Sequence, residues 1–252
     1  MTESTYAAES GHWYTKDGTP AYEVLSAKGE PRPTTLRDAR KLGLYPSVTA
    51  IIKSAAQPGL EIWKQRQVLM AALTLPRQVD EPDAAYIARV LQDSKEEAKA
   101  AADQGTRVHA SIEGFYLGEP DIEYPDAAEA FREAAHGYFG ERAIGLEAKT
   151  TFAHPLGYGG MLDLHNPSLV LDVKTKDDVE GVELYEEHYM QLAAYRQGVC
   201  LPEARCAIAF MTRAAPWTVR IIEADPRDLA RGWEMFRALL AYWQARTGHR
   251  PA

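Results

Sequence analysis

The chain has 252 residues, of which 46% are hydrophobic and 25% charged, the composition of an ordinary soluble globular protein. No segment approaches the roughly 18 consecutive apolar residues of a membrane-spanning helix, which excludes a spanning protein. The first ten residues include two acids and no apolar core, so we expect neither a signal nor a transit peptide and a cytoplasmic location. Two cysteines are too few for a disulfide scaffold, a four-thiolate zinc site or an iron–sulfur cluster.

The charge is unevenly distributed. A net charge of −8, from 36 acids and 28 bases, excludes a protein that binds nucleic acid mainly by bulk charge. Residues 28–41 carry five bases and two acids, a local +3, whereas residues 147–195 carry nine acids and three lysines, a local −6. A basic arm and an acidic centre fit a nuclease that grips phosphates and holds metal ions, and they equally fit ordinary solvated faces.

The first half of the chain is expected to be mostly helical. Residues 11–14 and 21–25 are typical of two short strands around a turn, and the two prolines in residues 29–33 indicate a loop. Ser47 is a suitable N-cap for a short helix over residues 48–54. Apolar residues at helical spacing then continue from residue 60 to residue 143.

The pattern changes near residue 147 to alternating strands and helices. Strands are expected at residues 149–154, 159–165, 169–175, 205–212 and 217–223, and helices at residues 186–199 and 226–246. The order of helices followed by βββ, α, ββ, α predicts an α/β fold with a helical front. We expect an N-terminal hairpin and basic arm in residues 1–45. Residues 46–252 would be one domain, with a helical front (46–146) and an α/β core (147–252).

Two acids and a lysine in the acidic centre form the candidate chemical site. Period-two alternation puts Asp172 and Lys174 on one face of the strand at residues 169–175. If the loop around residues 166–168 has an even length, Asp163 lies opposite Asp172; an odd length would separate them. A divalent cation can bind paired carboxylates and activate a water, and Lys174 can stabilise developing phosphorane charge. The alternative is a surface strand with a routine Asp–Lys pair.

Four motifs in one order resemble a known family. They are Pro46-Ser47-Val48-Thr49, then Gly105-Thr106-x-x-His109, then Gly159-Gly160-x-x-Asp163 with Asp172-x-Lys174-Thr175, and lastly Gln191-x-x-x-Tyr195. Together they resemble the PD-(D/E)XK nuclease superfamily, in particular its RecB-type exonuclease branch, which includes phage exonucleases and the mitochondrial genome maintenance exonuclease. The resemblance implies a mixed central β-sheet flanked by helices in αβββαββα order.

The resemblance also implies roles for individual residues. Asp163 and Asp172 would bind metal, with Lys174 as the catalytic lysine. His109 and the backbone carbonyl of Val173 would complete the metal shell.

Other residues are expected near that site. Gln191 and Tyr195 share a helix face and would stand beside it, although Tyr195 fits a core residue equally well. Glu147 precedes the first core strand, where family members often carry an acid. His109 has an alternative as a packed histidine, and Glu113, one turn further on, fits an exposed helix acid better than a site residue.

The activity implied by the resemblance is a Mg²⁺- or Mn²⁺-dependent deoxyribonuclease with one or two ions and no iron–sulfur cluster. An exonuclease preferring single-stranded DNA or a free end, acting in phage or bacterial recombination, repair or genome processing, fits best. A recombination or single-strand-binding protein is a candidate partner. The alternatives are a structure-selective endonuclease and a catalytically silent DNA-binding or scaffold subunit. Polarity, DNA or RNA preference and oligomeric state are left open.

The N-terminal segment is a candidate DNA contact. Aromatic rings beside basic residues suit single-stranded DNA, and hydroxyls near a helix N-terminus can accept a phosphate. Packing of an aromatic hairpin on the helical front is the alternative. The expected DNA-binding residues are Trp13, Arg37, Arg40, Lys41, Ser47 and Thr49, with His12, Tyr14 and Tyr22 as further aromatic residues.

Overall fold

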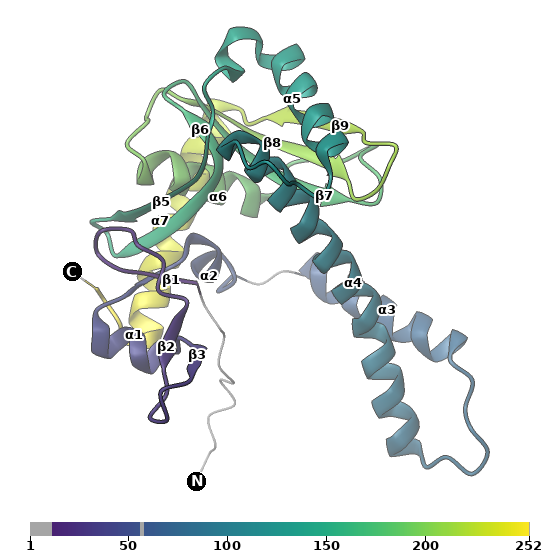
Figure 1. The fold of residues 1–252 in the computed structure, drawn as a ribbon. Coiled ribbons are helices and arrows are strands. Elements are labelled where there is room, and N and C mark those ends of the chain that lie inside the picture. Colours follow the sequence, from purple (N-terminus) through teal and green to yellow (C-terminus); the bar gives the residue numbers. More distant parts are fainter. Residues whose placement is uncertain (1–11, 56–57, 252) are drawn as a thin grey trace.

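A five-stranded mixed sheet forms the centre of the molecule (Figure 1). The structure is a computed structural model that describes residues 12–55 and 58–251. The strand order is β5-β6-β7-β8-β9, in which β7 and β8 are parallel and the other neighbours antiparallel. The strands are β5 (Glu147–His154), β6 (Tyr158–Asn166), β7 (Leu169–Lys176), β8 (Arg205–Thr212) and β9 (Val219–Glu223).

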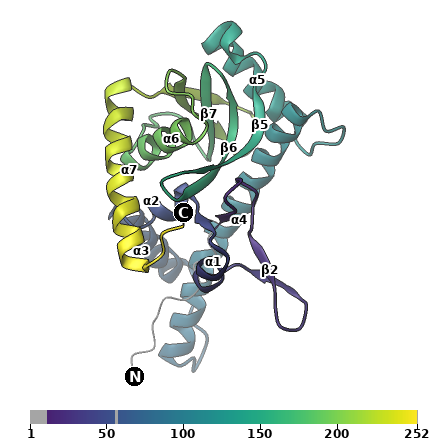
Figure 2. The ribbon, with the colours of Figure 1, turned by 90° about the vertical axis from the view of Figure 1, so that its left-hand side faces the viewer.

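Helices cover both faces of this sheet (Figure 2). On one face lie α6 (Glu186–Gly198) and α7 (Pro226–Thr247), and on the other lie α4 (Asp83–Leu117) and α5 (Pro125–Phe139). A short 3₁₀ turn, η1 (Gly140–Ala143), links α5 to β5. The predicted α/β fold with a helical front is confirmed at this level, because all seven core elements occur within about two residues of the predicted ranges.

Strand β7 is buried on both faces, because a helical layer covers each side of the sheet. Val170 belongs to the apolar cluster under α6 and α7, whereas Leu171 and Val173 belong to the cluster under α4 and α5. A strand between two helical layers has no solvent-facing side, so it forms a nearly continuous apolar run. Against that background, Asp172 and Lys174 are charged residues within this apolar strand, and the site described below accounts for their presence.

The N-terminal segment pairs differently from the prediction. Strand β1 (Trp13–Tyr14) pairs with β4 (Tyr45–Pro46), and β2 (Glu23–Leu25) pairs with β3 (Pro31–Pro33). Part of the predicted loop at residues 29–33 is therefore a strand. The two expected strands meet beside their turn, where Tyr14 and Pro20 form an isolated antiparallel bridge and the Ala21 N–H donates to the Trp13 carbonyl. The expected basic arm contains a helix, α1 (Leu36–Leu42), which begins at a capping box of Thr35 and Asp38.

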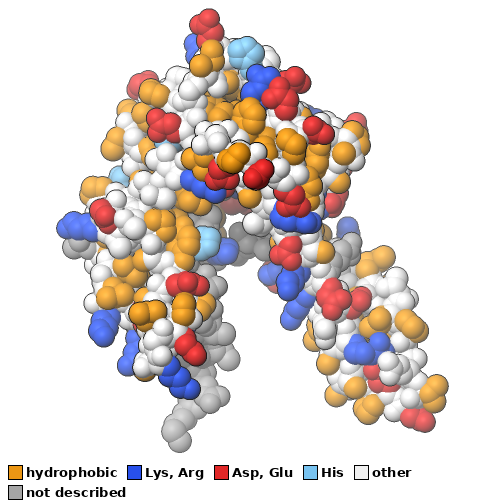
Figure 3. Space-filling model, in the orientation of Figure 1, with side chains coloured by type: hydrophobic (Ala, Val, Ile, Leu, Met, Phe, Trp, Pro, Cys, Tyr) orange, Lys and Arg blue, Asp and Glu red, His pale blue; other side chains and the backbone are white. Residues whose placement is uncertain are grey.

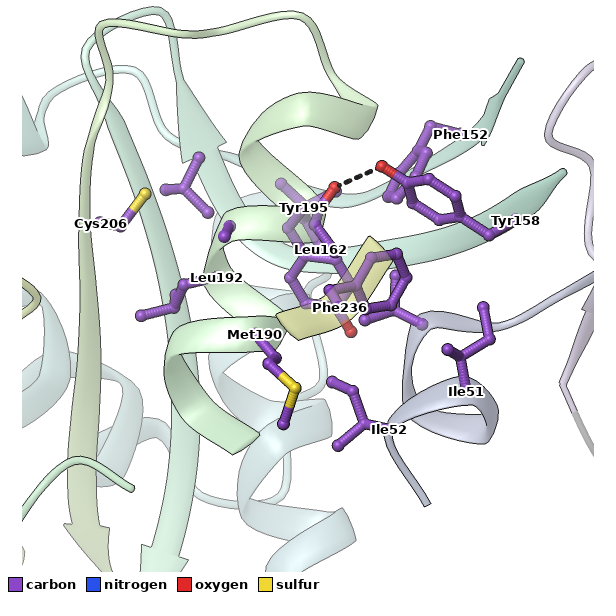
Figure 4. Close-up of a cluster of buried hydrophobic side chains, with 14 of the residues drawn as sticks. Ile51, Ile52, Phe152, Tyr158, Leu162, Met190, Leu192, Tyr195, Cys206 and Phe236 are labelled. Carbon is purple, nitrogen blue, oxygen red and sulfur yellow. Dashed lines mark hydrogen bonds between the residues drawn. The ribbon is translucent and has the colours of Figure 1, made fainter. Parts of the chain in front are cut away.

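This N-terminal segment shares its core with the sheet. Trp13, Leu44 and Ile51 lie in the same cluster as Leu192 of α6 and Phe236 of α7. Figure 4 shows part of this cluster, in which the two isoleucines of α2 (Val48–Ile52) approach α6 and α7. The burial fixes the N-terminal segment on the α6–α7 side of the fold.

A helical hairpin projects away from this body. Helix α3 (Pro58–Thr74) and the first half of the 35-residue α4 form an antiparallel pair that extends beyond the sheet (Figure 1). The second half of α4 continues into the body and packs against β5 and β7. Within the described residues, no helix is both long and apolar enough to cross a membrane.

Candidate metal centre

The turn between β6 and β7 meets the condition set by the sequence. Leu164 pairs with Leu171 and Asn166 with Leu169, which leaves a two-residue turn. Continuing this register by one position puts Asp163 opposite Asp172. The even loop length therefore brings the two acids to neighbouring positions of adjacent strands.

The backbone pairing of β6 with β7 ends at these acids, and there a carboxylate, in place of a backbone carbonyl, accepts a hydrogen bond from β7. The Val173 N–H donates to Asp163 Oδ2 at 2.7 Å. Leu162 and Leu164 lie in the two opposite apolar clusters, although strict alternation predicts that they share a face. The face of β6 thus switches at Asp163, so its carboxylate points toward α4 while Asp172 contacts α6.

The neighbouring strand β5 is distorted at the same level. Ala148 pairs with Leu164 and Thr150 with Leu162, so Lys149 is at the position opposite Asp163. Lys149 has a φ of 57°, a left-handed conformation that is costly for a non-glycine residue inside a strand. Its Nζ lies 3.1 Å from Glu113 Oε2 of α4. Sequence periodicity cannot anticipate this lysine, because the conformation breaks the alternation on which it relies.

Helix α4 contributes two ligand-type side chains from one face. His109 and Glu113 are four residues apart and project toward the sheet at Asp163. The helix approaches β7 closely because Gly105 has no side chain: a Cβ there would lie 2.5 Å from Thr175 Oγ1. This contact gives the Gly-Thr-x-x-His pattern a physical reason.

One ligand atom from each of His109, Glu113 and Asp163 can lie within 4.8 Å of the others. His109 Nδ1 is 3.8 Å from Asp163 Oδ2, and its Nε2 is 2.6 Å from the Val173 carbonyl oxygen. Glu113 is only 8% exposed, so the preferred sequence interpretation of an exposed helix acid is wrong. The sequence signal that points to Glu113 is its spacing of four residues from His109, which puts the two side chains on one face of the helix.

Asp172 is bound to the other side of the centre. It is almost fully buried, with Oδ2 2.5 Å from Lys174 Nζ and Oδ1 accepting from Gln191 Nε2 at 2.9 Å. Gln191 Nε2 also donates to the Tyr195 hydroxyl at 3.0 Å. Tyr195 is buried too, so both interpretations of this residue hold: it packs in the core and it borders the site.

Burial and charge leave the centre with unfavourable electrostatics. Burial, together with the nearby Asp172 carboxylate, raises the pKa of Asp163 to about 7, although His109, Lys174 and the Val173 N–H each lower it. Burial by itself lowers the pKa of Lys174, but the Asp172 and Asp163 carboxylates outweigh it and the net pKa is raised. Perturbed carboxylates of this kind are typical of functional sites.

The donor set fits a hard divalent cation. Two carboxylates and an imidazole lie together, and burial with the nearby Asp172 raises the pKa of Asp163, so its charged form lacks full compensation. Carboxylate oxygens suit Mg²⁺, and an added imidazole suits Mn²⁺. In the described chain Asp172 is outside this set of three; one of its oxygens accepts from Gln191 and the other lies against the Lys174 ammonium.

Several expected site residues lie elsewhere. Glu147 is exposed and pairs with His165, away from the ligand set. Trp13 is 4% exposed and its ring N–H donates to the Thr34 carbonyl, an arrangement that fits packing and leaves no ring face for a base. Ser47 caps α2 by accepting from the Ala50 N–H.

The remaining expected DNA contacts lie on or near α1 and α2. Thr49 is half-buried, with its hydroxyl 3.2 Å from that of Ser47. Arg37, Arg40 and Lys41 are exposed on α1, and the Arg40 guanidinium donates to the Thr247 carbonyl. Their DNA-binding roles stay predictions.

Comparison with known proteins adds limited information. No protein-family model and no curated protein matches the chain. Among solved structures, a candidate exonuclease from Eubacterium rectale is similar at 15% identity and a TM-score of 0.40, over 58% of this chain and 68% of that one. A phage-related exonuclease from Haemophilus somnus 129PT is similar at 17% identity and a TM-score of 0.31, over 72% and 93%. At these values the likeness assigns neither a family nor an activity.

Proposed function

We propose that the chain is a Mg²⁺- or Mn²⁺-dependent nuclease that hydrolyses phosphodiester bonds in DNA. The observation that carries the proposal is the convergence of Asp163, Asp172 and Lys174 on adjacent strands with His109 and Glu113 of α4. Three acids, two lysines and one imidazole gather here, and a group of this kind is costly to desolvate unless it has a function. The ligand set differs from the one implied by the sequence resemblance, because it contains Glu113 in place of Asp172.

His109, Glu113 and Asp163 would hold the metal, with the Val173 carbonyl as a neighbouring oxygen. When bound, a divalent ion lowers the pKa of a coordinated water and neutralises charge on a phosphodiester. The Val173 N–H fixes one oxygen of Asp163, which orients the carboxylate toward His109. Preorganised ligands of this kind reduce the cost of binding the ion.

Lys174 would supply the fixed positive charge at the reacting phosphate. Its side chain is about one-third exposed, so it can reach a substrate while Asp172 holds its position. The raised pKa keeps Lys174 protonated at neutral pH, so it donates hydrogen bonds to negatively charged phosphate oxygens. Gln191 in turn fixes Asp172 and is itself held against Tyr195.

Exonuclease action is the finer part of the proposal and rests on the motif resemblance, with DNA recombination or repair in a phage or bacterial setting as the context. The test compares single-stranded DNA labelled at its 5′ or 3′ end with covalently closed circular single-stranded DNA. Each is incubated with Mg²⁺, Mn²⁺ or EDTA.

We expect metal-dependent loss of label from linear DNA only, and the label released first gives the polarity. Cleavage of the circle would assign an endonuclease on the same centre. Failure to cleave any DNA with either metal would refute the enzymatic proposal and favour a DNA-binding subunit.

A further inference from the structure

An aromatic stack stands at the start of the described chain. The rings of His12 and Tyr22 are 4.4 Å apart at an interplanar angle of 23°, with His12 on the exposed side. Tyr14 closes the stack from the edge, with its ring 5.7 Å from Tyr22 and the two hydroxyls 2.9 Å apart. Tyr14 is fully buried, so the stack is anchored to the core and one face of His12 is left uncovered by Tyr22.

A short path of contacts joins this stack to the metal centre. Tyr14 packs on Gly159 of β6, where an added Cβ would lie 2.9 Å from its ring. At the next residue, Gly160, an added Cβ would lie 3.0 Å from the Tyr195 ring. Tyr195 accepts from Gln191, which donates to Asp172. The two glycines of the motif thus leave room for the N-terminal tyrosine and the site tyrosine at successive positions of β6.

Electrostatics agree with this proximity. After burial, Tyr22 and Tyr195 are among the groups that raise the pKa of Tyr14, and Tyr22 also contributes to the raised pKa of Tyr195. Burial lowers the pKa of His12, and the exposed Lys53 ammonium lowers it further. His12 is therefore a neutral flat ring at pH 7, with a cation close by.

We propose that the outer face of the His12 ring, backed by Tyr22, stacks on an unpaired base of a single-stranded polynucleotide whose phosphodiester lies at Asp163 and Lys174. This inference rests on the proposed function and names its substrate as single-stranded. A flat ring supports any base without reading its sequence, and only an unpaired, unstacked base exposes a face to it. Lys53 is placed to contact a backbone phosphate of the same strand.

The shape of the molecule agrees with this assignment. Figure 3 shows a hollow between the described N-terminal segment and the α3–α4 hairpin, with both basic and acidic side chains at its border. The sheet and the base of α4 lie above the hollow (Figure 1).

The experiment measures binding of fluorescein-labelled oligothymidylate with Mn²⁺, in a Lys174→Ala background that prevents turnover. His12→Ala is expected to weaken binding about 10-fold, within the range for loss of one base–aromatic stack. His12→Phe should restore the affinity. His136→Ala, at an exposed histidine of α5, is the matched control and should bind as the background does.

A scan with one abasic position in the oligonucleotide localises the contact. With His12 present, an abasic substitution at one position of the oligonucleotide should lower the affinity about 10-fold. The same substitution should have no effect on binding to His12→Ala. His12→Leu, which keeps apolar packing on Tyr22, gives a second reading if His12→Ala unfolds.

Unchanged affinity in His12→Ala and His12→Leu, or an identical abasic profile with and without His12, would overturn the inference even if the wild-type protein cleaves DNA. A His12-dependent profile without any wild-type cleavage would instead refute the proposed nuclease and retain the stacking site.

Discussion

Replacing Asp163 by asparagine tests whether the centre stores unfavourable charge. Asparagine keeps an oxygen that can accept from the Val173 N–H but removes the charge. The folded pKa of about 7 exceeds the ordinary 3.8, so between these values the folded protein retains a proton that the unfolded chain has lost. The free energy of unfolding therefore falls as pH rises through this window, and the penalty is complete above about pH 7.

The magnitude follows from the same pKa. The gap between 3.8 and about 7 corresponds to about 4 kcal/mol, at roughly 1.4 kcal/mol per pH unit. The side chain is 15% exposed, so solvent screening lowers this, and we expect about 2 kcal/mol.

Urea unfolding of metal-free protein at pH 5 and pH 8 measures the effect. About two of the three pH units between 3.8 and 7 lie above pH 5, so Asp163→Asn should gain about 1 kcal/mol over wild type at pH 8 relative to the difference between them at pH 5. Asp121→Asn, at an exposed loop acid, is the control and should show no such pH dependence. A difference between Asp163→Asn and wild type that is the same at both pH values would refute the reasoning.

Three further predictions concern packing and charge. Gly105→Ala should lower the free energy of unfolding by about 1–3 kcal/mol and slow cleavage, because the added Cβ would meet Thr175 Oγ1. Adding Thr175→Ala to this variant should restore the stability and the cleavage rate. A double variant no better than Gly105→Ala alone would contradict this. Trp13→Ala should destabilise the protein by about 3–5 kcal/mol in urea unfolding; unchanged stability with weaker single-strand binding would reinstate its DNA role. DNA affinity should fall when EDTA removes the metal, because the uncompensated Asp163 repels phosphate; equal affinity with and without metal would contradict this.

The regular part of the fold was accessible from the sequence. Alternation in β7 and the two-residue turn after Asn166 are local properties, so the register that puts Asp163 opposite Asp172, and the pairing of Asp172 with Lys174, could be predicted. Helical stripes likewise predicted α4 and α5. Long elements with strong periodicity carry their own signal.

The irregular part of the site was not accessible. The face switch at Asp163 and the left-handed Lys149 arise where strands stop pairing, and periodicity assumes that pairing continues. Glu113 was undervalued because its burial depends on how closely α4 approaches the sheet at Gly105. Trp13 was overvalued as a DNA contact because its burial arises from α7, more than 200 residues away in the chain.

The most direct test of the nuclease centre is a cleavage time course that compares Lys174→Ala with Lys176→Ala. Lys176 is an exposed residue two positions further along β7, so the pair separates the site from general loss of positive charge. With end-labelled single-stranded DNA and Mg²⁺ or Mn²⁺, we expect at least about 100-fold slower cleavage for Lys174→Ala, as for loss of a charge-stabilising group. Lys176→Ala should cleave at about the wild-type rate. Equal rates for the two variants, with both folded, would contradict the assignment of this centre as the site of hydrolysis.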